Sequence, residues 1–230
     1  MQSVRSTQQW SFEGDLPAFL HTTIVFEKNG DYFICYSQER QPSLDAESIN
    51  ALTPQMIPKD HIWPLYEKNL TICNNPTNHN VYIKQPRLTA YNNTSALAKL
   101  VLQEARVCEI LMQNPHPNIA EYLGCCIQND RIVGLCFPRY AETAEERKRR
   151  GFSIDKKLFL GQIKAAVAHL QALNLAHNDI KASNIMFSTE SSEHAVLVDF
   201  DSCAMKDEPL PAKRGLPDAL GIEELANFLS

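Results

Sequence analysis

The sequence predicts an α+β fold, with strands prominent early in the chain and helices prominent later. Three observations predict this class. Residues 22–36 hold two runs of β-branched and aromatic side chains around an Asn-Gly turn, which is typical of a β-hairpin. Residues 95–113 and 154–173 repeat apolar side chains with the period of a helix. Residues 185–198 hold two short apolar runs separated by a polar turn, which favours a second hairpin.

The first domain is predicted to span residues 1–60 and to consist of the hairpin and a linker. Residues 39–60 are rich in polar side chains and proline, so we interpret them as the linker, with a short helix over residues 44–52. The hairpin either forms a small accessory sheet or pairs with the strands that follow it. The sequence alone leaves both arrangements open.

Residues 61–140 are predicted to be rich in strands, with one helix. A short strand is expected over residues 81–84, and two more are expected over residues 121–126 and 132–137, joined by a polar turn. The helix over residues 95–113 follows an Asn-Thr-Ser segment that can cap its start. Its apolar stripe consists of Leu97, Leu100, Val101, Ala105, Cys108 and Leu111.

Residues 141–230 are predicted to be mainly helical. The helix over residues 154–173 carries an apolar stripe that we expect to face the core, and a further helix is expected to begin at Asp218. Residues 185–187 and 195–198 are expected to pair as two buried strands. The stripe of the long helix consists of Leu160, Ile163, Ala166, Val167, Leu170 and Leu173.

Two short motifs carry the chemistry of the chain. Residues 177–184 read H-N-D-I-K-A-S-N and residues 198–201 read V-D-F-D, which places Asp199 twenty residues after Asp179. These motifs resemble the catalytic loop (H-R-D-x-K-x-x-N) and the metal-binding segment (D-F-G) of the protein kinases. The resemblance implies a two-lobed kinase-like fold, with a small β-rich N-lobe and an incomplete helical C-lobe.

The resemblance also implies phosphoryl transfer from ATP, a reaction that depends on positioning and on neutralising charge. Asp179 would orient the acceptor hydroxyl and take its proton, and Lys181 would steady the transferred group. Asn184 and Asp199 would hold Mg2+. Lys181 also matches the branch of the family that phosphorylates serine and threonine.

Residues 81–84 read V-Y-I-K and are similar to the kinase strand V-A-I-K, whose lysine contacts the phosphates of ATP. In the family this lysine pairs with a glutamate of the next helix. The resemblance therefore implies that Lys84 contacts the phosphates of ATP and pairs with Glu104. Glu109 is the alternative partner of Lys84.

Residues 138–140 resemble the hinge between the two kinase lobes. Adenine would then form hydrogen bonds with the backbone of Pro138 and Tyr140. Phe137 would guard the back of the nucleotide pocket, and Met186 would form its floor.

Several residues depart from the kinase pattern. Residues 70–79 contain no glycine, although a glycine-rich loop normally covers the phosphates. Tyr82 stands where the family places a small alanine, so its ring either closes the pocket or stacks on the base. Asp201 replaces the glycine of D-F-G. Asn178 replaces the arginine that usually grips a phosphorylated loop, which argues against switching by phosphorylation of that loop.

The helix beginning at Asp218 resembles the central helix of the large kinase lobe, but it starts nineteen residues after Asp199 with no A-P-E motif between them. We therefore interpret the chain as a truncated or abridged kinase domain, in which Asp218 braces the catalytic loop. Its apolar residues are expected to be partly bare. These are Leu220, Ile222, Leu225, Phe228 and Leu229.

Composition indicates a soluble intracellular domain. A net charge of -5 gives no reason to expect nucleic acid or membrane as a partner, and seven cysteines without a C-x-x-C pair indicate reduced thiols. We therefore expect a cytoplasmic location. The basic cluster at residues 147–150 raises a nuclear location as the alternative, although Glu142, Glu145 and Glu146 are expected to pair with it along an exposed helix.

Three functions remain open. The first is an ATP-dependent protein serine/threonine kinase, with ATP, Mg2+ and a protein substrate as its ligands. The second is a pseudokinase, a nucleotide- or partner-binding module without turnover, which the missing glycines favour. The third is a small-molecule phosphotransferase similar to the aminoglycoside and choline kinases, whose metal-binding aspartate often lies in a D-F-D setting.

Overall fold

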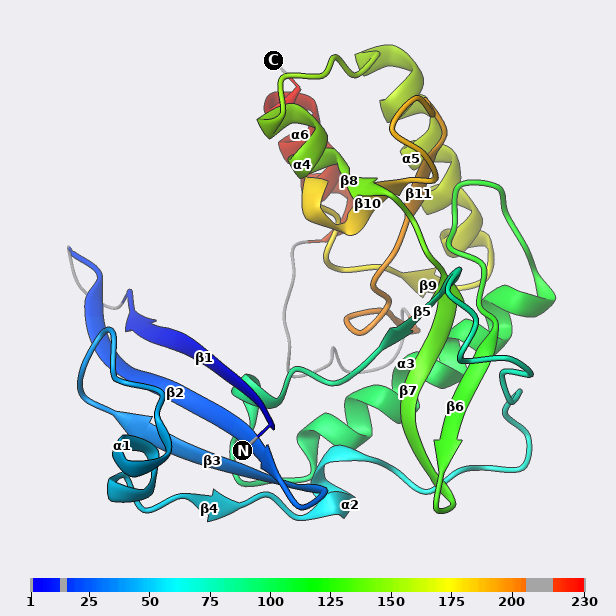
Figure 1. Cartoon of the computed structure of the whole chain (residues 1–230). Helices are drawn as coiled ribbons and strands as arrows, with labels where there is room; N and C mark the ends of the chain where they lie inside the picture. Colours follow the sequence, from blue (N-terminus) through cyan, green and yellow to red (C-terminus); the bar gives the residue numbers. More distant parts are fainter. Residues whose placement is uncertain (1, 13–15, 206–216, 230) are drawn as a thin grey trace. The chain divides into compact units, whose positions relative to one another are not determined.

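The computed structural model describes residues 2–12, 16–205 and 217–229 (Figure 1). The chain divides into two compact units, which are described in turn. The first contains residues 1–65 and 86–99, and the second contains residues 66–85 and 100–230. The predicted boundary at residue 140 therefore lies inside the second unit.

The first unit is built around a four-stranded antiparallel sheet, ordered β1-β2-β3-β4. The predicted hairpin is confirmed, because Lys28 pairs with Asp31 across a turn in which Asn29 and Gly30 both have positive φ angles. The strand before the hairpin was not predicted. The bounds are β1 (Gln2–Ser11), β2 (Ala18–Lys28), β3 (Asp31–Ser37) and β4 (Gln55–Met56).

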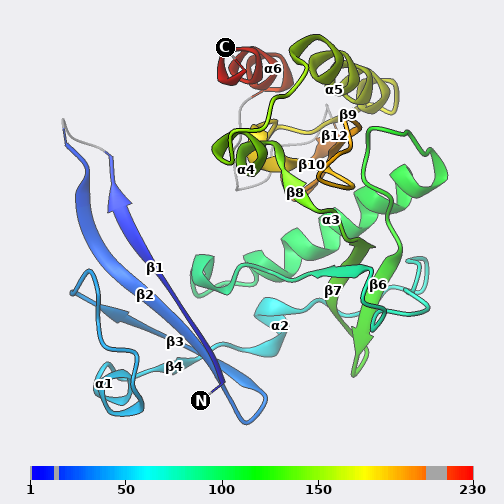
Figure 2. The same cartoon turned by 45° about the horizontal axis from the view of Figure 1, so that its top comes forward.

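Both faces of this sheet are covered, as the continuous burial of residues 22–26 in β2 indicates. Val25 packs in a cluster with Ile62 and Leu88, whereas Ile24 packs in a second cluster with Ile49. The helical segments of this unit are α1 (Ala46–Ala51), α2 (Lys59–Ile62) and the 3-10 turn η1 (Leu88–Ala90); α1 and α2 are visible in Figure 2. The predicted linker thus contributes α1 and β4 to the unit.

The second unit contains a separate three-stranded antiparallel sheet with the order β5-β7-β6. No strand ladder among the described residues joins it to the β1–β4 sheet, so the N-terminal hairpin belongs to a sheet of its own. The strands are β5 (Val81–Lys84), β6 (Gly124–Gln128) and β7 (Arg131–Pro138). The predicted helix is present as α3 (Ala96–Gln113).

Residues 71–73, in the segment before β5, run along the β6 edge of this sheet. Ile72 forms a parallel bridge with Cys125, and the Cys73 N–H donates to the Cys125 carbonyl at 2.9 Å. Gly124 is required at this contact, because its φ is +113° and a Cβ there would lie 2.6 Å from the Cys73 nitrogen. In the sheet order, β5 lies at the opposite edge.

The remainder of the second unit is mainly helical, with short strands that hold the loops. The helices are α4 (Ala144–Arg149), α5 (Lys156–Ala172), the 3-10 turn η2 (Ala182–Asn184) and α6 (Asp218–Phe228). One sheet has the order β11-β10-β8 and another pairs β12 with β9. These strands are β8 (Glu142–Thr143), β9 (Leu175–Ala176), β10 (Ile185–Phe187), β11 (Ala195–Leu197) and β12 (Ala204–Met205).

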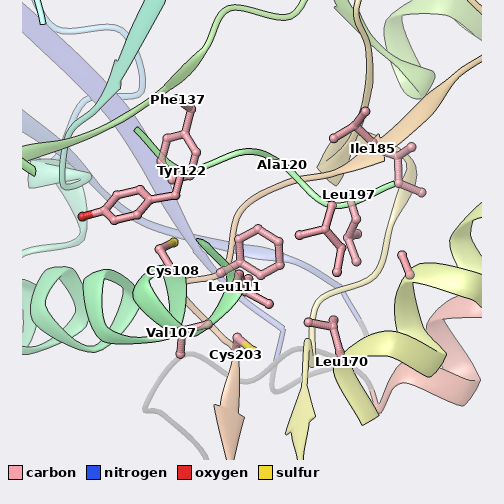
Figure 3. Packing of buried hydrophobic residues seen from close by; sticks show 14 of the residues in the cluster. Val107, Cys108, Leu111, Ala120, Tyr122, Phe137, Leu170, Ile185, Leu197 and Cys203 are labelled. Atoms are coloured by element: carbon pink, nitrogen blue, oxygen red, sulfur yellow. The ribbon is translucent and has the colours of Figure 1, made fainter. Parts of the chain in front are cut away.

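One core connects these elements within the second unit. Figure 3 shows Cys108 and Leu111 of α3 in the same cluster as Leu170 of α5 and Leu197 of β11. The stripes predicted for the two long helices are largely buried in this core. The α+β prediction is confirmed.

Two expectations about exposure are wrong. Arg147 is buried rather than lying on an exposed helix: its guanidinium contacts Glu142 at 2.8 Å and lies 3.7 Å from the centre of the Phe187 ring. Leu225 of α6 was expected to be partly bare but is buried, because the inner face of α6 packs on the common core. Leu220 is exposed as expected. No helix in the described part of the chain is long and apolar enough to span a membrane.

Candidate functional site

Lys84 lies between two carboxylates in the second unit. Its Nζ is 2.5 Å from Oε1 of Glu104 and 2.5 Å from Oδ1 of Asp199. The other candidate partner, Glu109, accepts hydrogen bonds from the backbone and the hydroxyl of Thr71 instead. The structure therefore brings together one residue each from strand β5, helix α3 and the loop after β11.

Burial and charge act against each other in this cluster. Burial lowers the pKa of Lys84, but the carboxylates of Glu104 and Asp199 outweigh it, so the pKa is raised above its ordinary value. Burial raises the pKa of Glu104, and Lys84 opposes that effect. Lys84 therefore favours its charged form, and its charge opposes the uptake of a proton by Glu104.

The D-F-D segment is fixed through its backbone. Asp199 has a φ of +68°, a left-handed conformation that aspartate tolerates better than most residues. The following residue, Phe200, donates its N–H to Oε1 of Glu104 at 3.0 Å, and its ring lies edge-on to His177 with centres 5.3 Å apart. Glu104 thus contacts both Lys84 and the segment that carries Asp199.

The catalytic-loop residues predicted from the H-N-D-I-K-A-S-N motif form a second group. Lys181 donates from Nζ to Oδ2 of Asp179 at 2.7 Å. The amide of Asn184 donates to the same Oδ2 and to the Asp179 backbone carbonyl, both at 2.9 Å. This group joins the first through the backbone, because the Val198 N–H donates to the Asn184 carbonyl at 3.0 Å.

Asp218, the first residue of α6, holds the start of the catalytic loop. Its two carboxylate oxygens accept the backbone N–H groups of His177 at 3.0 Å and Asn178 at 2.7 Å. The His177 ring lies between the two motifs, with Nε2 3.1 Å from the Val198 carbonyl and Nδ1 3.3 Å from the Asp179 nitrogen. All of these loop contacts are buried or partly buried.

A cavity of about 440 Å³ opens beside these groups, a size suited to a small ligand. Lys84, Asn184 and Asp199 line one part of it, and the predicted hinge lines another. The other predicted residues at its wall are Tyr82, Phe137, Pro138, Tyr140 and Met186. The predicted adenine-binding and phosphate-binding residues therefore surround one space.

Arg139 is a cavity residue that the sequence interpretation missed. Its guanidinium donates to the carbonyls of His79 at 3.1 Å and Val81 at 3.0 Å, and it lies 6.0 Å from the centre of the Tyr82 ring. It therefore ties the start of β5 to the hinge beside a tyrosine that is 48% exposed. The only signal in the sequence was its place inside the predicted hinge.

The donor atoms suit a hard cation such as Mg2+. Among the described residues, no three histidine, cysteine, aspartate or glutamate side chains gather in a group that could hold a metal. A carboxylate from Asp199 and an amide oxygen from Asn184 match the oxygen ligands of Mg2+, which commonly takes its other ligands from substrate phosphates and water. The residues present therefore fit a metal that arrives with a nucleotide.

The buried His177 predicts a dependence of stability on pH. Burial lowers its pKa from the ordinary value of 6.5, although Asp218 and other neighbours oppose this. The unfolded chain therefore takes up a proton below about pH 6.5 that the folded chain does not, so the free energy of unfolding falls as the pH drops. At pH 5.5 this residue should contribute a loss of up to ~1.4 kcal/mol.

Urea unfolding at pH 5.5 and pH 7.5 measures this loss. The variant His177→Gln should show a smaller difference between the two pH values than the original chain. An equal difference in both proteins would contradict the assignment to His177.

Comparison with known proteins identifies similar sequences. The family model for the protein kinase domain matches residues 68–213, which include all the site residues named above except Asp218. The serine/threonine-protein kinase TAO3 of Xenopus laevis is 30% identical over 112 residues, which cover 47% of this chain. The matched segment spans 12% of that relative's length.

Proposed function

The chain belongs to the protein kinase family, and from that membership and the site geometry we propose that it binds Mg-ATP and transfers the γ-phosphoryl group to serine or threonine of a protein. The observation that carries the proposal is the position of Lys84. It contacts Glu104 and Asp199 at 2.5 Å each, beside the cavity of about 440 Å³. A cation held in this way is placed to receive phosphates.

Within this proposal, adenine occupies the hinge side of the cavity. It forms hydrogen bonds with the Pro138 carbonyl and the Tyr140 N–H, over the side chain of Met186. The proline at position 138 does not weaken this hydrogen bonding, because adenine contacts its carbonyl and proline lacks only the N–H. The phosphates then point toward Lys84.

The acceptor hydroxyl lies at Asp179. This carboxylate orients the hydroxyl and takes its proton, while the contact with Asn184 keeps it in place. Lys181 neutralises charge on the transferred group. When bound, Mg2+ would lie at Asn184 and Asp199 and would neutralise charge on the phosphates.

Turnover tests the proposal. The chain should transfer labelled phosphate from ATP to a library of serine- and threonine-containing peptides, slowly because residues 70–79 provide no glycine-rich cover. The variant Asp179→Asn should reduce the rate by about 100-fold or more, since a positioned general base contributes that much. Asp130→Asn, in the exposed β6–β7 turn, is the matched control and should keep the rate.

A second function, nucleotide binding without turnover, is favoured by one observation. Ile72 bridges to Cys125, so residues 71–73 follow the β6 edge of the sheet. These residues belong to the segment where the family has its glycine-rich loop, but they lie at the edge opposite β5, which carries Lys84. Nucleotide binding by the original chain, combined with a turnover rate equal to that of Asp179→Asn, would support this second function and contradict the first.

Phosphorylation of amino-alcohols or aminoglycosides but not of peptides would instead support a small-molecule phosphotransferase. Asp201 in the D-F-D segment favours this third function.

Tyr82 decides how the cavity receives a base. Its ring is 48% exposed, lines the cavity and lies near the Arg139 guanidinium, so we expect it to stack on adenine. Tyr82→Ala should weaken the affinity for Mg-ATP by about tenfold, the usual scale for losing one aromatic–base stack. Tyr82→Phe keeps the ring and should bind as the original chain does.

Isothermal titration of the three proteins with Mg-ATP measures this effect. Tighter binding by Tyr82→Ala would show that the ring closes the cavity. Unchanged binding would contradict stacking.

A further inference from the structure

Asn178 occupies the position at which the family has an arginine, and its side chain bridges two backbone segments. Its Nδ2 donates to the carbonyl of Ala176, just before the catalytic loop, and to that of Ser202, just after the D-F-D segment, both at 3.2 Å. The residue has a φ of +62°, a conformation that asparagine adopts more readily than most residues. The side-chain hydrogen bonds and the backbone conformation therefore both favour asparagine at this position.

Other contacts fix the same stretch of chain after Asp199. The side chain of Gln103 donates to the Cys203 carbonyl at 3.0 Å, and Ala204 pairs with Ala176 in the β12–β9 ladder. Ser202 and Cys203 are completely buried. The segment that carries Asp199 is thus held by helix α3 on one side and by the catalytic loop on the other.

The sequence after this segment offers little for phosphorylation. Residues 203–217 contain no serine, threonine or tyrosine. The single hydroxyl between Asp201 and Asp218 is that of Ser202, which is buried and donates to the Asp201 carboxylate. A phosphorylated serine, threonine or tyrosine in residues 203–217 is therefore not available to order this segment.

We infer that Asn178 is a positioning residue that holds the D-F-D segment in place, so that the site is assembled without a phosphate on the segment that follows. The amide bridge does by neutral hydrogen bonds what an arginine does through a phosphate. The test of this role on residues 199–204 needs no ligand. Only the consequence for Mg-ATP rests on the proposed function.

Hydrogen exchange of the full chain without ligand tests the inference directly. Asn178→Gly keeps the positive φ but removes the amide, and Asn178→Asp keeps the shape but faces carbonyl oxygens with acceptors. In both variants the amides of residues 199–204 should exchange about tenfold faster than in the original chain, the scale of one or two lost hydrogen bonds. Asn129→Gly, at another positive φ in the β6–β7 turn, is the matched control and should leave them unchanged.

Three further measurements test the inference: exchange after phosphatase treatment, the affinity for Mg-ATP and the affinity for metal-free ATP. Phosphatase treatment should not change exchange at residues 199–204, and the affinity for Mg-ATP should fall in Asn178→Gly while that for metal-free ATP is kept. Unchanged exchange in both Asn178 variants, or equal acceleration throughout α5, would overturn the inference, and so would faster exchange after phosphatase. If the original chain binds no Mg-ATP, the proposed function fails, whereas the exchange experiment still decides the role of Asn178.

Discussion

Replacing Lys84 by methionine should abolish stabilisation of the chain by Mg-ATP and lower its free energy of unfolding by about 3 kcal/mol, the lower end of the range for breaking a buried ion pair. The variant leaves Glu104, which is 4% exposed, and Asp199 without the cation they share. The loss stays near the lower end because burial already raises the pKa of Glu104, which can take up a proton. Urea unfolding with and without Mg-ATP measures both effects.

A double-mutant cycle isolates the ion pair. Glu104→Gln removes the buried charge, so the combined Lys84→Met and Glu104→Gln variant should be more stable than the sum of the single losses predicts. Lys164→Met, on an exposed position of α5, is the control and should change stability by less than about 0.5 kcal/mol. Strict additivity would show that Glu104 and Lys84 do not stabilise each other.

Replacing Asp218 by alanine should cost about 3 kcal/mol, because two buried N–H groups would lose a charged acceptor. These are the backbone groups of His177 and Asn178, at 3.0 and 2.7 Å from the carboxylate. Asp218→Asn keeps one acceptor oxygen and should lose about half as much. These two hydrogen bonds anchor the catalytic loop. Turnover should therefore fall further in Asp218→Ala than in Asp218→Asn.

Urea unfolding of Asp218→Ala, Asp218→Asn and an exposed control on the same helix, Glu223→Ala, measures the series. The control should stay within about 0.5 kcal/mol of the original chain. A loss below about 1 kcal/mol in Asp218→Ala would show that the carboxylate does not hold the loop.

Local patterns accounted for much of the fold. The hairpin around Asn29 and Gly30 and the helices α3 and α5 were predictable because turn chemistry and apolar period are written in adjacent residues. Strand β1 was not, because its sequence, QSVRSTQQWS, is mostly polar and forms a strand through pairing with β2.

Some features of the candidate site were also predictable from the sequence, and others were not. The resemblance to the kinase motifs placed Lys84, Glu104 and Asp199 on separate elements, and the structure brings the three side chains into contact. The path of residues 71–73 along β6 was not predictable, because it depends on a single parallel bridge and on the absence of a side chain at Gly124. The burial of Arg147 was missed for a similar reason: its partners include carbonyls of the β10–β11 turn, more than forty residues away.

In the proposed function, Lys84 and Asp199 form a nucleotide site that depends on a metal. Isothermal titration of the original chain and of the variant Asp199→Asn with ATP, in Mg2+ and in a chelator, measures this dependence. We predict weak binding that is tighter in Mg2+, and a variant in which the effect of Mg2+ is lost. Absence of binding by the original chain, or an equal gain in affinity from Mg2+ in Asp199→Asn, would show that these residues do not form a metal-dependent nucleotide site.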